Sequence, residues 1–233
     1  MNTVITGATK GIGRALANKF GKEGHHLAIC ARNADDLART KADLEEQYRG
    51  IEVFTMVADI SKKSDILAFG HAVVNHFNQI DVLINNGGVF MPGATLEEAD
   101  GRLEGMMETN LYSAYHLTRA VYPYMAKHAK SHIFNMCSIA SQIAYPNGGS
   151  YSISKFALLG YTKVLRQELM SEGIRVTAIM PGATWSDSWA GVDLPKDRLM
   201  EAKDIADTVW AAYQLSAGAV IEEIVIRPQL GDL

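Results

Sequence analysis

Three glycines lie in the short segment that joins the first apolar run of the chain to the first run with helical spacing. Residues 3–6 are expected to form a strand, a helix is expected from Gly11, and the joining residues read Gly7-Ala8-Thr9-Lys10-Gly11-Ile12-Gly13. A helix N-terminus presents unpaired N–H groups and a partial positive charge, and glycines let a phosphate approach that backbone. The spacing is wider than the common G-x-G-x-x-G fingerprint, and a turn without a ligand is the alternative. Its place between a strand and a helix favours a dinucleotide-binding turn.

The rest of the chain alternates short apolar runs with longer segments of helical spacing. Repeated strand–helix–strand order predicts right-handed crossovers and a parallel sheet with both faces covered. We therefore expect a single α/β domain over residues 1–233, with a Rossmann-type doubly wound, seven-stranded parallel sheet and helices on both faces. The predicted strands are Thr3–Thr6, His26–Ala31, Glu52–Val57, Val82–Asn85, His132–Cys137, Arg175–Met180 and Glu222–Arg227. The predicted helices are Gly11–Glu23, Ala34–Tyr48, Lys62–Phe77, Gly101–Lys127, Ser150–Glu172 and Lys203–Leu215.

The third predicted helix shows both an apolar face and a start signal. Its apolar residues at helical spacing are Ile66, Phe69, Val73 and Phe77. Ser61 is predicted to be its N-cap, and Asp65 adds a carboxylate to its first turn.

Composition excludes several classes of partner. A formal net charge of −4, without a long run of like charge, argues against nucleic acid. No apolar run is long enough to span a bilayer, and Met1 is followed at once by the first strand, so neither a membrane segment nor a signal peptide is expected. Cys30 and Cys137 are expected to be buried thiols, and so few cysteines fit a reducing, cytoplasmic setting. No Cys, His and Asp cluster has metal-ligand spacing, so no catalytic metal is expected.

The end of the second predicted strand indicates the type of dinucleotide. NAD sites place a carboxylate there to bond the ribose 2′-OH, but this strand ends Cys30-Ala31-Arg32-Asn33. Arg32 could bind a 2′-phosphate, and Lys10 could add a second positive charge. The alternative is that both are solvated surface cations. With the acid missing, the sequence favours NADP(H) over NAD(H).

A tyrosine and a lysine start the helix after the fifth predicted strand. Tyr151 and Lys155 are four residues apart and share one helix face. A phenol titrates near pH 10, and a neighbouring ammonium together with an oxidised nicotinamide ring would lower that value. In the reductive direction the same phenol can protonate a developing alkoxide. Ser138, just past the fifth strand, could hydrogen-bond the substrate oxygen, although by itself it fits a turn or cap residue equally well.

These features occur in the order found in one enzyme family. The chain resembles the short-chain dehydrogenases/reductases from Thr3 to about Arg227. The motifs that carry the resemblance are Thr6-Gly7-x-x-x-Gly11-x-Gly13, Asp59, Asn85-Asn86-Gly87-Gly88, Asn110, Ser138, Tyr151-x-x-x-Lys155 and Pro181-Gly182.

The resemblance implies a role for each matching residue. Tyr151 would be the acid/base, Ser138 would orient the carbonyl, and Lys155 would bind the nicotinamide ribose and lower the tyrosine pKa. Asn110 would hold a water that links Lys155 to solvent, and Asp59 would contact the adenine. The full set of predicted cofactor contacts is Gly7, Thr9, Lys10, Gly11, Ile12, Gly13, Arg32, Asp59, Ile60, Asn86, Gly87, Tyr151, Lys155, Pro181, Gly182 and Thr184.

Two departures from the family pattern stand out. The fourth-strand motif usually reads Asn-Asn-Ala-Gly, and Gly87 takes the place of the alanine, which loosens the backbone without abolishing cofactor binding. The carboxyl end, residues 220–229, lacks the glycine-rich ending of the acyl-carrier-protein reductases, which puts that branch in doubt.

Several functions therefore stay open. The first is an NADP(H)-dependent oxidoreductase that moves a hydride between nicotinamide and a small ketone, aldehyde or alcohol. A 3-oxoacyl-thioester reductase of the same family is the nearest alternative. A non-catalytic NADP(H)-binding sensor or scaffold would not need the Tyr–Lys pair. A methyltransferase would not need it either, and usually carries an acid at the end of the second strand.

Substrate pocket and assembly are predicted only in outline. The segment at about 183–202 is expected to be a substrate loop, with a plain surface loop as the alternative. The predicted pocket wall is apolar and consists of Phe90, Met91, Ile139, Ile143, Tyr145, Trp185 and Trp189. The predicted helices 101–127 and 150–172 carry apolar residues on more than one face, so a homodimer or homotetramer is expected, as is common in the family.

Overall fold

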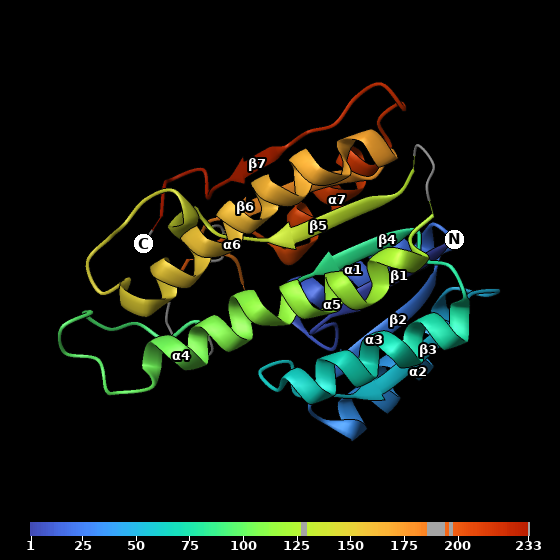
Figure 1. Ribbon diagram of the computed structural model, residues 1–233, viewed down its shortest axis with the longest axis horizontal. Coiled ribbons are helices and arrows are strands. Elements are labelled where there is room, and N and C mark those ends of the chain that lie inside the picture. Colours follow the sequence, from blue (N-terminus) through green and yellow to red (C-terminus); the bar gives the residue numbers. More distant parts are fainter. Residues whose placement is uncertain (127–129, 186–193, 196–197, 233) are drawn as a thin grey trace.

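Seven parallel strands form one sheet in the computed structural model, which describes residues 1–126, 130–185, 194–195 and 198–232. The strand order is β3-β2-β1-β4-β5-β6-β7, and every neighbouring pair is parallel (Figure 1). The bounds are β1 (Asn2–Thr6), β2 (His26–Ala31), β3 (Val53–Val57), β4 (Val82–Asn85), β5 (His132–Met136), β6 (Arg175–Pro181) and β7 (Glu223–Ile226). The doubly wound parallel fold predicted from the alternating pattern is confirmed, and each predicted strand agrees with an observed one to within a residue at either end.

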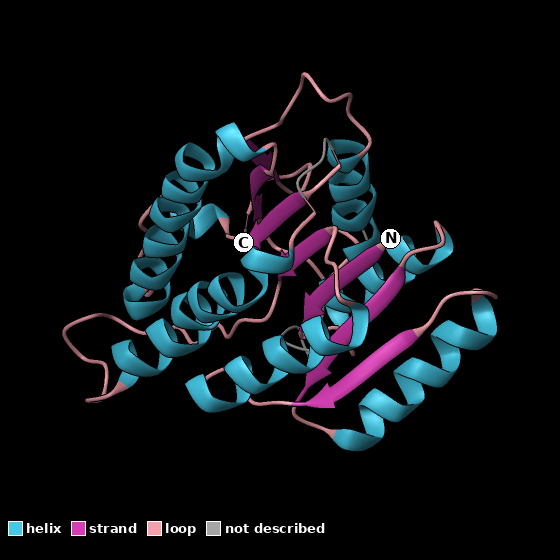
Figure 2. Ribbon diagram, turned by 45° about the vertical axis from the view of Figure 1, so that its right-hand side comes forward, coloured by secondary structure: helices cyan, strands magenta, loops and turns pink. Residues whose placement is uncertain are grey.

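Helices cover both faces of the sheet (Figures 1 and 2). One face is covered by α3 (Lys63–Phe77), α5 (Ser113–Val121) and α6 (Gly149–Leu169), and the other by α1 (Gly11–Lys22), α2 (Ala34–Gln47) and α7 (Ala202–Tyr213). Each layer buries its apolar stripe against the sheet, in which β4, β5 and β6 are buried at every residue and the edge strands β3 and β7 are partly exposed. The two main apolar clusters lie on opposite faces of the sheet, and their strand residues alternate accordingly, for example Ile5 in one and Val4 in the other.

The strand order reverses between β1 and β4, because β1 pairs with β2 on one side and with β4 on the other. Chains that leave β1 and β4 therefore run to opposite faces of the sheet. In such sheets ligands bind in the crevice outside the carboxyl ends of the strands at this point. In Figure 1 the arrowheads of β4 and β5 point toward the side on which α4 (Arg102–Met107) lies.

The predicted helix 101–127 is not one regular helix. It consists of α4, a π-helical turn (η1, Glu108–Tyr112), α5 and a 3₁₀ turn (η2, Tyr122–Tyr124), and residue 127 lies outside the described residues. Two hydroxyls bond back to carbonyls at the π turn: Thr109 donates to the Gly105 oxygen and Ser113 to the Thr109 oxygen. Pro123, which fixes φ and has no N–H, lies in the 3₁₀ turn that ends the segment. In contrast, the predicted helix 150–172 is continuous to Leu169 and ends in a 3₁₀ turn (η4, Met170–Glu172).

The prediction that Ser61 caps α3 is wrong. The helix begins one residue later than predicted, its N-cap is Lys62, and no side chain caps it. The Ser61 hydroxyl instead donates to Asp59 Oδ1 at 2.8 Å, and Ser61 lies one residue before the N-cap position. Asp65 is in the first turn, as predicted, and its carboxylate accepts from the Asp59 N–H at 3.1 Å.

The fold buries two histidines, which makes its stability depend on pH. His25 lies just before β2, with Nδ1 2.7 Å from Thr3 Oγ1 and its ring edge-on to Phe20. Burial, with the nearby N-terminal ammonium, lowers the pKa of His25 to about 4. Burial also lowers the pKa of His132, which is stacked on Phe134. Both rings are therefore neutral in the folded protein at neutral pH.

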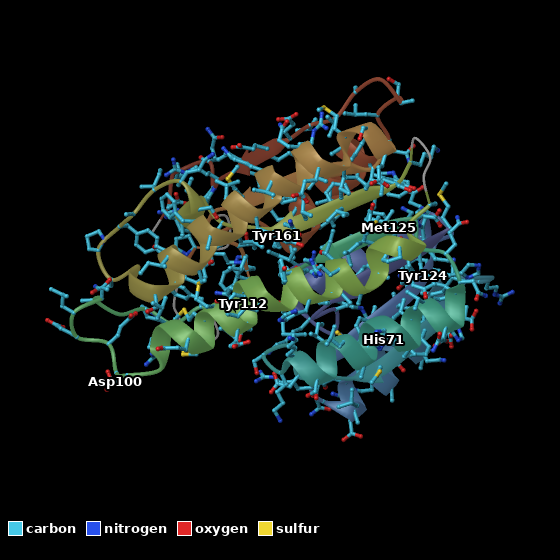
Figure 3. All side chains as sticks on the ribbon, viewed as in Figure 1. His71, Asp100, Tyr112, Tyr124, Met125 and Tyr161 are labelled. Carbon is cyan, nitrogen blue, oxygen red and sulfur yellow. The ribbon has the colours of Figure 1, made fainter. Side chains whose placement is uncertain are left out.

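Stability should fall on acidification between pH 6.5 and 4. In this window the unfolded chain binds protons that folded His25 does not, so the free energy of unfolding falls by up to ~1.4 kcal/mol per pH unit from this residue. Urea unfolding at several pH values measures the slope. His25→Phe should remove part of it, whereas His71→Gln, at an exposed position on α3 (Figure 3), should leave it unchanged. Equal slopes in all three proteins would contradict the assignment.

Candidate active site

Two loops that leave β1 and β4 are joined by one hydroxyl and one amide. Thr6 Oγ1 accepts from the backbone N–H of Asn86 at 3.1 Å and of Gly87 at 2.8 Å. The Asn86 side-chain amide donates to the carbonyls of Thr6 at 2.9 Å and Gly7 at 3.2 Å. These four bonds fix the two backbones on either side of the point where the strand order reverses.

The glycine turn is packed too closely for side chains. Gly7 and Gly11 have φ values of 65° and 54°, a region that favours glycine. A Cβ on Gly13 would lie 2.1 Å from the Gly7 carbonyl oxygen, so α1 can begin against this turn only with glycine at that position. The arrangement leaves backbone at the start of α1, where a helix N-terminus favours an anionic group. The residues present thus fit the pyrophosphate of a dinucleotide.

Gly87 lies where neighbouring side chains, and not a positive φ, restrict the space for a Cβ. Its φ is not positive, but a Cβ would lie 2.4 Å from Ile60 Cδ1 and 3.2 Å from Thr6 Oγ1. The glycine that departs from the family motif is therefore matched to the isoleucine at position 60. It reflects close packing and not a need for a looser backbone.

Charged groups gather where the second and third strands end. Arg32 is exposed directly after β2, Lys10 is exposed in the glycine turn, and Asp59 follows β3. The Ser61 hydroxyl, followed by the Ser61 N–H and the positive charge of Arg32, lowers the pKa of the Asp59 carboxyl. Asp59 is therefore a charged hydrogen-bond acceptor, and the exposed guanidinium of Arg32 lies near it. This pair of charges suits the part of a nucleotide that carries both N–H donors and a phosphate.

Tyr151 lies near the start of α6 with its phenol beside Ser138. Burial raises the pKa of Tyr151 to about 12, and the hydrogen bond with the Ser138 side chain acts in the opposite direction. Loss of water around the phenol is the larger of these two effects. The phenol is thus held in its proton-bearing form. The lowered pKa expected from the ammonium together with an oxidised nicotinamide ring stays a prediction. Ser138 also caps the 3₁₀ turn Ile139–Ser141 (η3), where its Oγ accepts from the Ala140 N–H at 3.1 Å.

Lys155 is a buried cation beneath the tyrosine. Its Nζ donates to the Met136 carbonyl at 2.7 Å and lies 5.8 Å from the centroid of the Tyr151 ring. Burial lowers the pKa of Lys155 to about 8. A Cβ on Gly88 would lie 3.5 Å from this ammonium and 3.0 Å from Asn110 Oδ1, so the loop after β4 approaches both side chains closely.

Asn110 is buried and holds two other elements together. Its Oδ1 accepts from the Val89 N–H at 2.8 Å, and its Nδ2 donates to the Val89 oxygen at 3.0 Å and to Ser154 Oγ at 2.9 Å. Ser154 Oγ in turn donates to the Tyr151 carbonyl at 2.7 Å. The π turn η1 therefore contributes a side chain that joins the β4 loop to the helix of Tyr151 and Lys155. Such turns occur often at functional sites.

The chain after β6 meets the C-terminal segment. Pro181 ends β6, the Gly182 N–H donates to the Ile226 oxygen at 2.8 Å, and Thr184 Oγ1 donates to the Gly182 oxygen at 3.0 Å. A Cβ on Gly182 would lie 2.2 Å from Asp232 Oδ1. Burial and the negative charge of Asp232 raise the pKa of Tyr145. The C-terminal segment therefore returns to the edge of the sheet that carries Tyr151.

The predicted pocket wall is placed only in part. The Phe90 ring packs edge-on against the Tyr151 ring, with the ring centroids 4.8 Å apart. Met91, Ile143 and Tyr145 are exposed, Ile139 and Trp185 are partly buried, and Trp189 lies outside the described residues. A joint apolar pocket of all seven stays a prediction, as does a substrate loop at 183–202.

Three residues in this site were missed in the sequence. They are Ser154, Glu98 and Asp232, and each holds or adjoins a site residue through contacts that span long stretches of sequence. Alternation of serines in Ser150-Tyr151-Ser152-Ile153-Ser154 was an available signal, because polar residues that recur at the start of a helix can face a neighbouring loop. Nothing local marks Glu98 or Asp232.

The described part of the chain contains neither a metal-binding cluster nor a membrane-spanning helix. Within it, no three His, Cys, Asp or Glu residues lie together so that they could hold a metal ion. None of its helices combines the length and apolar character needed to cross a bilayer.

Known proteins share both the sequence pattern and the fold. Residues 1–196 match the family model described as short chain dehydrogenase. A sepiapterin reductase of Chlorobaculum tepidum is 34% identical over 99% of this chain and 97% of its own length. A 3-oxoacyl-(acyl-carrier-protein) reductase of Staphylococcus epidermidis is 29% identical over 89% of each chain.

Solved structures agree. The alcohol dehydrogenase of Thermococcus sibiricus, complexed with 5-hydroxy-NADP, superposes with a TM-score of 0.90 at 27% identity and covers 100% of this chain and 98% of its own. The L-sorbose reductase of Gluconobacter frateurii, complexed with NADPH and L-sorbose, gives 0.87 at 25% identity over 97% of this chain and 95% of its own. Together with the ordered motifs and the geometry of the sheet edge, these matches establish that the chain belongs to the short-chain dehydrogenase/reductase family of oxidoreductases.

Proposed function

We propose that this chain is an NADP(H)-dependent reductase of a small ketone or aldehyde, reversible in principle, with Tyr151 as the proton donor. The observation that carries the proposal is a phenol kept protonated by burial, hydrogen-bonded with Ser138 and adjacent to the buried ammonium of Lys155. The reductase names of the relatives support the direction, and so does the NADPH in the sorbose reductase structure.

The residues divide the work of reduction. NADP(H), when bound, supplies the hydride for the carbonyl carbon. Tyr151 gives its proton to the carbonyl oxygen as negative charge develops there, and the Ser138 hydroxyl holds that oxygen. Loss of the proton leaves a phenolate, which the Lys155 ammonium stabilises through its charge. Asn110 holds the β4 loop against α6, through its hydrogen bonds with Val89 and Ser154, beside Tyr151 and Lys155.

Arg32 and Lys10 are proposed to select NADP(H). Arg32 follows β2 where an NAD site would have an acid, and its charge already acts on Asp59. A guanidinium and an ammonium at this end suit the 2′-phosphate of NADP(H). The remaining predicted contacts, Thr9, Ile12, Ile60, Pro181, Gly182 and Thr184 among them, are proposed from their place along the same sheet edge.

A 3-oxoacyl-thioester reductase is the second candidate. It is supported by the Staphylococcus epidermidis relative and by a putative ketoacyl reductase of Streptomyces coelicolor that is 32% identical over 93% of this chain. The C-terminal segment speaks against it, because residues 227–232 fold back on Gly182 instead of ending in a glycine-rich tail.

Replacing Tyr151 by phenylalanine should abolish reduction. Loss of a positioned acid costs about 100-fold or more in rate. NADPH absorbance, followed over a panel of ketones, aldehydes and 3-oxoacyl thioesters, measures it. Tyr124→Phe, at an exposed position in η2 (Figure 3), is the matched control and should keep the wild-type rate. If wild type and Tyr151→Phe reduced every compound equally fast, the mechanism would be abandoned. Binding of NADPH without any turnover would favour the sensor or scaffold.

The wild-type rate should also depend on pH through Lys155. Its pKa is lowered to about 8, so the ammonium is present below that pH and is lost above it. Reduction is therefore expected to slow as the pH rises above about 8, while the phenol is still protonated. Lys155→Met should be slow throughout and lose this dependence. An alkaline fall of the same size in Lys155→Met would show that another group titrates.

Reversing the charge at position 32 should change the cofactor preference. Arg32→Asp removes a cation and adds an acid that suits a ribose 2′-OH. The ratio of kcat/KM for NADPH to that for NADH should fall at least about 10-fold, since a charge-assisted bond of ~1.5–3 kcal/mol is lost. Arg49→Asp, an exposed arginine before β3, is the control. An unchanged ratio in Arg32→Asp would remove Arg32 from the phosphate site.

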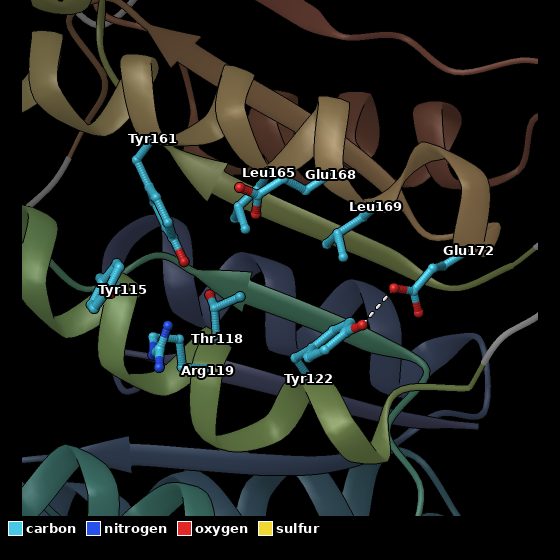
Figure 4. Close-up of a pocket in the computed structure, with 9 residues that line it drawn as sticks. All are labelled: Tyr115, Thr118, Arg119, Tyr122, Tyr161, Leu165, Glu168, Leu169 and Glu172. Atoms are coloured by element: carbon cyan, nitrogen blue, oxygen red, sulfur yellow. Dashed lines mark hydrogen bonds between the residues drawn. The ribbon is translucent and has the colours of Figure 1, made fainter.

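We also propose that the chain assembles as a homodimer or homotetramer through α5 and α6. Residues of both helices line a groove between them (Figure 4). Tyr115 on α5 and Phe156 and Val164 on α6 are exposed apolar side chains, and a second copy of the chain would bury such surface. The groove is lined by Tyr115, Thr118, Arg119, Tyr122, Tyr161, Leu165, Glu168, Leu169 and Glu172.

Light scattering coupled to size exclusion should give at least twice the mass of one chain. Tyr115→Glu should shift the mass toward the monomer, because it places a charge in the interface. Leu96→Glu, at a fully exposed loop position, should have no effect. A monomer at every concentration of the wild type would exclude the assembly.

A further inference from the structure

The helix that carries Tyr151 is capped from a distant loop. Its own N-cap residue, Gly148, makes no side-chain cap bond. Glu98 performs this task from 52 residues away: both carboxylate oxygens accept from the Ser150 N–H, at 3.1 and 3.2 Å, and one also accepts from the Ser150 hydroxyl. A carboxylate at this end of a 21-residue helix satisfies an otherwise unpaired donor and is favoured by the helix dipole.

The first turn of α6 approaches the Glu98 loop closely at Gly149. A Cβ on Gly149, whose φ is 32°, would lie 2.4 Å from the Gly93 carbonyl oxygen and 2.4 Å from Glu98 Oε1. The Gly93 N–H donates to the Asn147 oxygen at 2.9 Å. The carboxylate is thus enclosed between its own loop and the first turn of α6, which limits the positions that Ser150 and its neighbour Tyr151 can take.

The same contact holds the loop that faces the phenol. The loop between β4 and α4 is fixed near its start by Asn110, which bonds Val89, and near its end by Glu98. Between these two points lies Phe90, whose ring packs on Tyr151. Freeing the Glu98 end would loosen both the helix turn that carries the phenol and the aromatic side chain beside it.

We infer that Glu98 is a positioning residue: its carboxylate fixes the first turn of α6, and with it Tyr151, against the Phe90 loop. The inference rests on the proposed reduction and adds a residue to it. Glu98 acts on the reaction through Ser150 and Tyr151, and it does not hold the cofactor. Its loss therefore lowers kcat and leaves the affinity for NADPH unchanged.

Three variants test this with NADPH and the carbonyl compound that the wild type reduces fastest. Glu98→Ala should lower kcat about 10- to 100-fold, the size expected when a reacting group is misplaced by about 1 Å. Glu98→Gln should keep kcat within about threefold. The glutamine side chain has the same length as glutamate, and its amide oxygen still accepts from the Ser150 N–H. Glu97→Ala, an exposed glutamate next in sequence, is the control. NADPH affinity, measured by fluorescence titration, should be the same in all.

Two outcomes overturn the inference. Equal kcat values for Glu98→Ala and Glu97→Ala would show that Glu98 does not position the phenol. A parallel loss of kcat, NADPH affinity and folded fraction in Glu98→Ala, with no rescue by Glu98→Gln, would show a general structural role. Failure of the proposed function is distinguishable, because Tyr151→Phe would then match the wild type before any change at Glu98 is made.

Discussion

The site depends on the junction between β1 and β4, where one hydroxyl holds two loops. Thr6 accepts two backbone N–H groups from the β4 loop, and Asn86 returns two bonds to the β1 loop. These four bonds join the glycine turn on one side to the β4 loop on the other. The same β4 loop approaches Asn110 and Lys155 at Gly88, where a Cβ would lie 3.0 and 3.5 Å from their side chains. The junction therefore sets the position of the glycine turn relative to two of the predicted site residues.

Burial sets the protonation states more strongly than the pairing of side chains does. The sequence predicts that a lysine four residues away, together with an oxidised nicotinamide ring, lowers the tyrosine pKa. In the protein alone, loss of water raises the phenol pKa and lowers the ammonium pKa. Both changes favour the neutral form of each group, which is the general effect of a low dielectric. The consequence is a phenol that holds its proton tightly beside an ammonium whose charge is more easily lost than that of an exposed lysine.

Much of the fold could be predicted because its signals are local. Apolar strands, helical spacing and the glycine turn are each read within a few residues, and all seven strands agree with the structure. The site could be predicted as a set of residues but not as a network. Asn110 reads as a helix surface residue, yet it is buried in a π turn, and the hydroxyl of Ser61 serves Asp59 instead of α3. Glu98 reaches Ser150 across 52 positions of sequence, a distance that no local pattern encodes.

The contact between Gly87 and Ile60 links two turns that are far apart in the chain. The methyl at the end of the isoleucine occupies the space where an alanine at position 87 would put its own carbon. An alanine at position 87 would therefore require the isoleucine side chain to turn aside or a shorter residue at position 60. The side chain after β3 and the backbone after β4 thus share one space, and the glycine leaves that space to the isoleucine.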